Sequence, residues 1–174
     1  FVIEEVGRID KLISEFLAFA KPAPLTLGYF RLGELTKEVL ELSAAECAAR
    51  GIACSFTDET DGSGCVLGEK NKIRQVLLNL TINAMEAMPK GGELTLRLSA
   101  PEDRRSVVLD IHDTGVGIEE KLLPSIHLPF ITTKKNGLGL GLAKAYAIIE
   151  EHGGSITCSS APGQGTLFTI RLHT

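Results

Sequence analysis

The sequence predicts a two-layer α/β sandwich, an α+β fold in which helices cover one face of a mixed, mostly antiparallel sheet, with a further helix at the N-terminus. Segments with helical spacing alternate along the chain with segments in which every second residue is apolar. Residues 93–99 and 106–112 carry polar residues on one side, whereas strands buried on both faces are continuously apolar. With 174 residues, 44% of them hydrophobic, the chain can bury a core of its own.

The first 20 residues are predicted to form a helix that packs against another helix. Its apolar residues recur at alternating steps of four and three, as in coiled coils and helical bundles: Val2, Val6, Ile9, Ile13, Phe16 and Ala20. Prolines at positions 22 and 24 predict a linker over residues 21–24, because proline lacks a backbone donor and disfavours helix in the preceding residue. The main domain is expected to span residues 25–174.

Within the main domain, periodicity and the positions of glycine and proline predict the remaining elements. Helices are expected over about 33–50, 69–88 and 138–152. Strands are expected around 25–30, 52–57, 65–67, 93–99 and 106–112, and in two segments after residue 152. Residues 119–136 form a polar connection of a length that is usually functional, so we interpret it as a lid, with a solvated basic loop as the alternative. Phe130 is a candidate to anchor that lid.

Composition excludes several classes of protein. Eighteen Lys and Arg against 22 Asp and Glu leave no basic excess for the phosphates of DNA or RNA, so we expect no nucleic-acid partner. No run of about 18 apolar residues and no secretion signal is present, which predicts a cytoplasmic location, whether or not the parent protein is anchored in a membrane. The four cysteines lack CxxC spacing, as is typical of reduced thiols.

A stripe of polar residues runs along the predicted helix 69–88. Asn79, Asn83 and Glu86 lie beside the apolar stripe, with apolar residues on their other side as well, so the two amides are expected to be half-buried and to need partners. They are either structural amides or part of a site for phosphate or a hard cation, since Mg²⁺ accepts amide oxygens as ligands.

Two glycine-rich motifs follow the strand 106–112. In Asp113-Thr-Gly-Val-Gly-Ile118, a carboxylate that can accept from an amine precedes two glycines that allow close approach of a ring or phosphate. In Gly137-Leu-Gly-Leu-Gly-Leu142, alternating glycines lead into a helix whose N-terminus can bind an anion. The spacing matches neither the dinucleotide fingerprint nor the P-loop.

Taken together, these motifs resemble the N, G1, F, G2 and G3 boxes of the ATP-binding catalytic domain of bacterial sensor histidine kinases, within the group that includes gyrase, Hsp90 chaperones and MutL. The matching residues are Asn79 and Asn83, Asp113-Thr-Gly-Val-Gly117, Pro129-Phe-Ile-Thr-Thr-Lys134, Gly137-Leu-Gly-Leu-Gly141 and Gly163-Gln-Gly-Thr-Leu-Phe168. The resemblance implies the Bergerat-type ATP-binding fold, with ATP and Mg²⁺ as cofactors. Residues 1–20 resemble the second helix of the kinases' dimerisation and phosphoacceptor hairpin.

The resemblance also implies a role for each matched residue. Asn83 would bind Mg²⁺, Asp113 would bind the adenine amino group, and Thr166 would lie near it. Asn79 by the phosphates and Lys134 on the γ-phosphate would take part in catalysis. The other residues expected to border the nucleotide are Gly115, Gly117, Ile118, Thr133, Gly137, Gly139, Leu140 and Gly141.

Position 79 separates the members of this group, because the gyrase, Hsp90 and MutL ATPases resemble one another in having a glutamate base there. An amide cannot take a proton from water at neutral pH, so Asn79 favours phosphoryl transfer to a histidine over hydrolysis. The family's acceptor helix is not in this chain; its other expected partners are a response regulator receiver domain and a second copy of the parent protein. Alternatives are an ATPase switch or chaperone, a protein serine kinase and a nucleotide-binding pseudokinase. His127, Leu128 and Leu138 depart from the family pattern around the lid.

Overall fold

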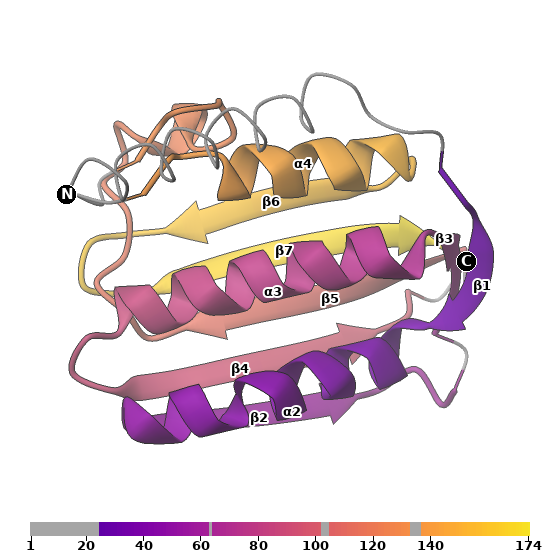
Figure 1. Cartoon of the computed structure of the whole chain (residues 1–174), viewed down its shortest axis with the longest axis horizontal. Helices are drawn as coiled ribbons and strands as arrows, with labels where there is room; N and C mark the ends of the chain where they lie inside the picture. Colours follow the sequence, from indigo (N-terminus) through magenta and orange to yellow (C-terminus); the bar gives the residue numbers. More distant parts are fainter. Residues whose placement is uncertain (1–24, 63, 102–104, 133–136) are drawn as a thin grey trace, which may run out of the picture.

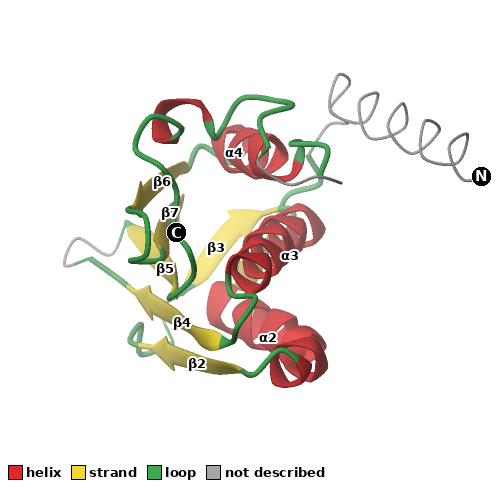
Figure 2. Cartoon of the chain, turned by 90° about the vertical axis from the view of Figure 1, so that its left-hand side faces the viewer, coloured by secondary structure: helices red, strands yellow, loops and turns green. Residues whose placement is uncertain are grey.

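The computed structural model describes residues 25–62, 64–101, 105–132 and 137–174. The expected N-terminal helix and linker lie outside the described residues, as do Thr133 and Lys134. The described part forms two layers, with a sheet on one side and helices on the other (Figures 1 and 2). This arrangement confirms the predicted fold class.

The main sheet has five strands and is mixed. In spatial order they are β2 (Ile52–Asp58), β4 (Gly92–Ser99), β5 (Ser106–Asp113), β7 (Thr166–His173) and β6 (Ser155–Ser160). β2 and β4 pair in parallel, and the other neighbouring pairs are antiparallel. The ends of β5 and β7 meet in register, with Asp113 opposite Thr166, so two residues that are far apart in the sequence become neighbours.

Three helices cover one face of this sheet: α2 (Leu32–Ala49), α3 (Lys70–Ala87) and α4 (Gly141–Glu151) (Figure 2). β1 (Gly28–Arg31) and β3 (Cys65–Gly68) form a separate two-stranded antiparallel sheet. A short 3₁₀ turn at Leu123–Ser125 lies within the segment interpreted as a lid. Figure 1 shows α3 between α2 and α4.

The hydrophobic core lies between the two layers. Leu94, Leu96 and Leu98 of β4 are fully buried, whereas Thr95 and Arg97, which alternate with them, are exposed on the other face. The same alternation buries Phe168, Ile170 and Leu172 of β7. Because successive side chains of a strand point to opposite faces, this pattern fixes which side of the sheet carries the helices.

The structure corrects two predicted element boundaries. The first strand begins at Gly28 rather than Leu25, and α4 begins at Gly141 rather than at residue 138. Gly139 has φ +66°, a left-handed conformation that does not belong to a helix. Residues 137–140 therefore form a loop before α4, and this loop is part of the site described below.

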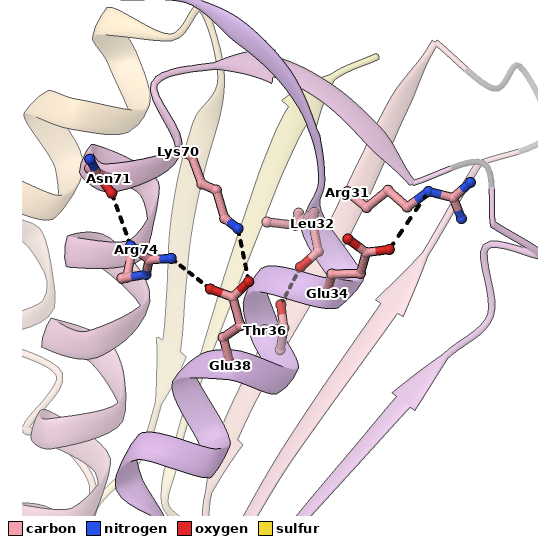
Figure 3. Close-up of polar contacts among 8 residues, drawn as sticks. All are labelled: Arg31, Leu32, Glu34, Thr36, Glu38, Lys70, Asn71 and Arg74. Carbon is pink, nitrogen blue, oxygen red and sulfur yellow. Dashed lines mark hydrogen bonds and ion pairs between the residues drawn. The ribbon is translucent and has the colours of Figure 1, made fainter.

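A polar cluster joins α2 to α3 (Figure 3). The Glu38 carboxylate accepts from Lys70 Nζ at 2.8 Å and from Arg74 Nη2 at 2.6 Å, and Arg74 Nη1 also donates to Asn71 Oδ1 at 2.9 Å. The hydrogen bond from Lys70, then that from Arg74, holds the pKa of Glu38 below its ordinary value. The cluster fixes the N-terminal end of α3 against α2.

His152 connects α4 to the start of α3. Its Nε2 accepts from the backbone N–H of Glu69 at 2.9 Å, so its Nδ1, which lies 2.6 Å from the carbonyl oxygen of Ile148, carries the proton and donates to it. Both ring nitrogens thus bond to the backbone, which gives the imidazole a structural role. α3 is thus held at its N-terminal end by neighbours on both sides.

Candidate functional site

A cavity of about 570 Å³ opens between α3, α4 and the ends of β5 and β7. Its lining comes from five segments that are separated in the sequence: Asn83, Ala84, Glu86 and Ala87; Asp113, Val116, Gly117 and Ile118; Leu122, Ile126, Ile131 and Thr132; Gly137, Leu138, Gly139, Leu140, Gly141 and Leu142; and Thr166 and Phe168. The volume is in the range of pockets that bind small molecules and cofactors. The fold therefore brings most of the predicted motifs to one hollow.

Asp113 supplies a buried acceptor at one end of the cavity. It ends β5 and is only 4% exposed, and its Oδ1 accepts from the backbone N–H of Gly115 at 2.8 Å. Burial raises the pKa of this carboxyl, while hydrogen bonds from the backbone N–H groups of Gly115 and Thr166 oppose the rise. This buried acceptor suits a ligand with an amino group. An amino group that entered a largely apolar pocket without an acceptor would be costly to bury, and Asp113 supplies that acceptor.

The loop after β5 is held by backbone contacts on both sides. The N–H of Val116 donates to the carbonyl oxygen of Ala87 at 2.9 Å, and its carbonyl accepts from the N–H of Gly163 at 2.8 Å. Gly117 has φ +71°, and a side chain there would collide with the carbonyl of Ala161. This loop is thus fixed between the C-terminal end of α3 and the turn that joins β6 to β7.

The loop's other glycine has a packing role. A Cβ atom at Gly115 would lie 2.6 Å from the carbonyl oxygen of Ala87 and 2.7 Å from Asp113 Oδ1. Gly115 is buried beneath the cavity and is not among the residues that line it, whereas Gly117 and Ile118 line it. Gly115 thus lets the loop approach α3 and lets its own N–H reach Asp113.

The two amides of α3 take different positions. Both are half-buried, as expected, but only Asn83 lines the cavity. Asn79 Nδ2 donates to the carbonyl oxygen of Gly141 at 3.2 Å, so it connects α3 to the first residue of α4. The amide oxygen of Asn83 is a ligand type that Mg²⁺ accepts. Within the described ranges, no group of three or more His, Cys, Asp or Glu side chains is placed to hold a metal ion.

The glycine segment before α4 borders the opposite end of the cavity. Gly137, Gly139, Leu140 and Gly141 all line it, and no side chain among the described residues caps the N-terminus of α4. The first N–H groups of a helix lack partners within the helix and carry its positive dipole end, which favours an anionic ligand.

The lid segment contacts the glycine segment through its backbone. The N–H of Phe130 donates to the carbonyl oxygen of Gly139 at 3.0 Å, while 58% of the Phe130 residue surface is exposed. Main-chain atoms of Phe130 therefore attach the lid segment to the glycine segment. Farther back in the lid, the rings of His127 and Tyr146 lie 5.7 Å apart, so His127 contacts α4.

Ser160 does not line the cavity but bonds to two residues that do, Ile118 and Thr166, and the sequence did not single it out. Its hydroxyl accepts from the backbone N–H of Ile118 at 2.9 Å and donates to the carbonyl oxygen of Gly165 at 2.7 Å. Its oxygen also lies 3.1 Å from the hydroxyl oxygen of Thr166. The available signal was a serine that ends a strand directly before a glycine-rich turn, a position where side chains often bond to the backbone.

Comparisons with known proteins give consistent results. The family described as histidine kinase-, DNA gyrase B- and HSP90-like ATPase matches residues 68–174. Sporulation kinase A of Bacillus subtilis is 41% identical over 170 residues, which cover 97% of this chain and 28% of that protein. This chain thus spans less than a third of the length of that relative.

Two solved structures extend the comparison. Full-length ShkA in complex with AMPPNP matches 98% of this chain and 37% of its own, with 26% identity and a TM-score of 0.84. Histidine kinase ThkA in complex with the response regulator protein TrrA matches 99% of this chain and 49% of its own, with 28% identity and a TM-score of 0.82. Across the described residues of this chain, no helix combines the length and apolarity that a membrane crossing requires.

Proposed function

Because the chain belongs to the histidine kinase-, DNA gyrase B- and HSP90-like ATPase family, we propose that it is the catalytic domain of a sensor histidine kinase. It binds ATP with Mg²⁺ and transfers the γ-phosphoryl group to a histidine of the parent protein. The observation that carries this proposal is a single cavity with a buried acid at one end and an uncapped helix N-terminus at the other. An adenine amino group and a chain of phosphates have the matching chemistry.

The base end would be set by Asp113 and Thr166. Both are 4% exposed and face each other across the β5–β7 pair, so they are held by the sheet rather than by a mobile loop. Ala84, Ile126 and Phe168 supply apolar surface in the same cavity, which suits the faces of a purine ring. The chain's own residues would thus orient the nucleotide from its base.

The phosphate end would be set by the glycine segment and α3. Gly137, Gly139 and Gly141 leave backbone N–H groups without side chains in the way, and the start of α4 contributes positive partial charge. Asn83 fits the magnesium expected with ATP, because its amide lines the cavity and offers an oxygen ligand. Bound magnesium supplies charge neutralisation of the phosphates. Lys134 is proposed to reach the γ-phosphate from the lid.

Asn79 supports transfer to a protein over hydrolysis. Its amide cannot act as a general base, and it already donates to Gly141 at the start of α4. We propose that it keeps the glycine segment and α3 in a fixed relation, while the nucleophile is an imidazole outside this chain. Catalysis would then come from positioning and neutralisation of charge.

The proposed partners are macromolecular. Relatives with this domain are sensor kinases, and ThkA was solved with a response regulator protein. We propose a phosphoacceptor helix of the parent protein as the immediate substrate, a receiver domain as the next acceptor, a homodimeric parent and a cytoplasmic site of action.

Binding is tested by calorimetric titration of this chain with ATP in the presence and absence of Mg²⁺. Asn83→Ala should abolish the magnesium-dependent part of the affinity and leave the melting temperature near that of the wild type. Wild-type affinity in Asn83→Ala would refute the metal assignment.

Transfer is tested by adding a separately expressed phosphoacceptor hairpin of the parent protein, with labelled ATP. The proposal expects phosphate on the hairpin that is labile in acid and stable in base, as phosphohistidine is. Acid-stable phosphate would indicate a serine kinase, and steady ATP turnover without the hairpin would indicate an ATPase. Absence of ATP binding would refute the proposed kinase function and both of these alternatives.

A further inference from the structure

The hydroxyl group of Ser160 takes part in three contacts that join separate parts of the site. It reaches the loop after β5 at the N–H of Ile118, the turn before β7 at the carbonyl of Gly165, and β7 itself at the hydroxyl of Thr166. The oxygen–nitrogen or oxygen–oxygen distances are 2.9, 2.7 and 3.1 Å. Each lies within the range of a hydrogen bond.

These contacts allow one arrangement of protons. The N–H of Ile118 supplies the proton of its own bond, whereas the carbonyl of Gly165 has none to give. The single proton of Ser160 must therefore go to Gly165. The bond between the two hydroxyls then needs the proton of Thr166, so Thr166 donates to Ser160.

This arrangement fixes what Thr166 can offer to the cavity. With its proton directed at Ser160, the Thr166 hydroxyl has only lone pairs left to present. Its neighbour across the sheet, Asp113, offers carboxylate oxygens that also accept. This end of the cavity thus presents two adjacent acceptors, and a ligand atom facing them must bring hydrogen.

We propose that Ser160 is a specificity-determining positioning residue of the proposed ATP site: it orients the Thr166 hydroxyl as an acceptor, so that the site selects a purine with an exocyclic amino group over one with a carbonyl at the same position. Without Ser160, Thr166 can turn its proton into the cavity and donate to a carbonyl. The preference for the amino purine then falls. This inference rests on the proposed nucleotide function, and its test separates the two.

The test compares ATP with inosine triphosphate, which carries a carbonyl oxygen in place of the adenine amino group and shares its ribose, triphosphate and magnesium. Calorimetry gives the dissociation constants of both nucleotides for the wild type and Ser160→Ala. The wild type should prefer ATP, and Ser160→Ala should lower the ratio of the two affinities about five- to tenfold, which corresponds to one hydrogen bond. Because the phosphates are identical, an effect on the phosphate end cancels in the ratio.

Two further variants show whether Ser160 acts through Thr166. Thr166→Val removes the hydroxyl, so adding Ser160→Ala to it should leave the ratio unchanged, as expected for two residues that act through one contact. Ser159→Ala is the matched control, because Ser159 is the exposed neighbour on β6 and its side chain points to the other face of the sheet. It should keep the wild-type ratio.

The outcomes are distinct. If the wild type binds neither nucleotide, the proposed function fails. If the wild type prefers ATP and Ser160→Ala weakens both nucleotides equally or neither, the inference is overturned and the proposed function stands. A fall in the ratio that also occurs on the Thr166→Val background would overturn the role of Thr166. Thermal melting of each variant confirms that the compared proteins are folded.

Discussion

Gly139→Ala is expected to weaken the binding of ATP much more than that of adenosine. Gly139 has φ +66°, a conformation that costs an alanine about 1–2 kcal/mol. Its new Cβ would also lie 2.6 Å from the carbonyl carbon of Phe130 and 2.7 Å from the backbone nitrogen of Ile131. Both are main-chain atoms, so the glycine segment or the start of the lid must shift.

The size of the effect on ATP affinity is estimated from the conformational cost of a left-handed alanine. If the segment relieves the contact by leaving its bound geometry, the conformational cost of about 1–2 kcal/mol becomes a loss of about 5- to 30-fold in ATP affinity. Adenosine has no phosphates to meet this segment, and Asp113 and Thr166 lie on the separate β5–β7 pair. The affinity for adenosine should therefore change less than about threefold, which is the usual size of the effect of a substitution away from the binding contacts.

Gly153→Ala is the matched control for the backbone term. Gly153 has φ +68°, but no described atom lies within 4 Å of an added Cβ. This variant should lose stability without losing ATP affinity. Calorimetric titrations with ATP and adenosine and urea unfolding of all three proteins provide the data. Equal losses for both ligands in Gly139→Ala, or an equal loss of ATP affinity in Gly153→Ala, would refute the role of the segment in phosphate binding.

Three other substitutions test the stability arguments. Thr81→Val should raise the free energy of unfolding in urea by about 1 kcal/mol, because the buried Thr81 hydroxyl has no hydrogen-bond partner among the described residues; a decrease would contradict this. Asp113→Asn should raise the melting temperature at pH 7 while it weakens ATP binding, because a pKa raised by burial means that the ionised carboxylate costs stability above that pKa; a lower melting temperature would count against it. Glu38 has a lowered pKa, so its contribution is present above the pKa of the unfolded chain and is lost as pH falls through the native one. Glu38→Gln should therefore flatten the acid side of the plot of unfolding free energy against pH. An unchanged slope would show that the cluster with Lys70 and Arg74 does not cause the loss of stability in acid.

The location of α3 shows how the fold links stability to the site. Glu38 and His152 hold the N-terminal end of this helix from both sides, and Asn79 connects its middle to α4. Asn83 follows one turn later and lines the cavity. The cluster with Glu38 therefore helps to position α3, and with it Asn83, as well as to stabilise the fold.

The sequence by itself determined the two layers and predicted several of the residues that line the cavity. Alternation in residues 93–99 predicted the buried face of that strand, because a strand's side-chain period is fixed by its backbone. The motifs around Asn83, Asp113 and Gly139 indicated one shared hollow, and the cavity contains all three.

The tertiary structure decided what each of these residues touches. Asn79 donates to a residue 62 positions away, Gly115 packs under the cavity against Ala87, and Ser160 bonds to a residue 42 positions earlier. The direction proposed for the Thr166 proton follows from the further bond that Ser160 donates to the carbonyl of Gly165. Periodicity and turn chemistry report on neighbours along the chain, whereas these bonds depend on the distances between segments that meet only when the sheet and helices have packed.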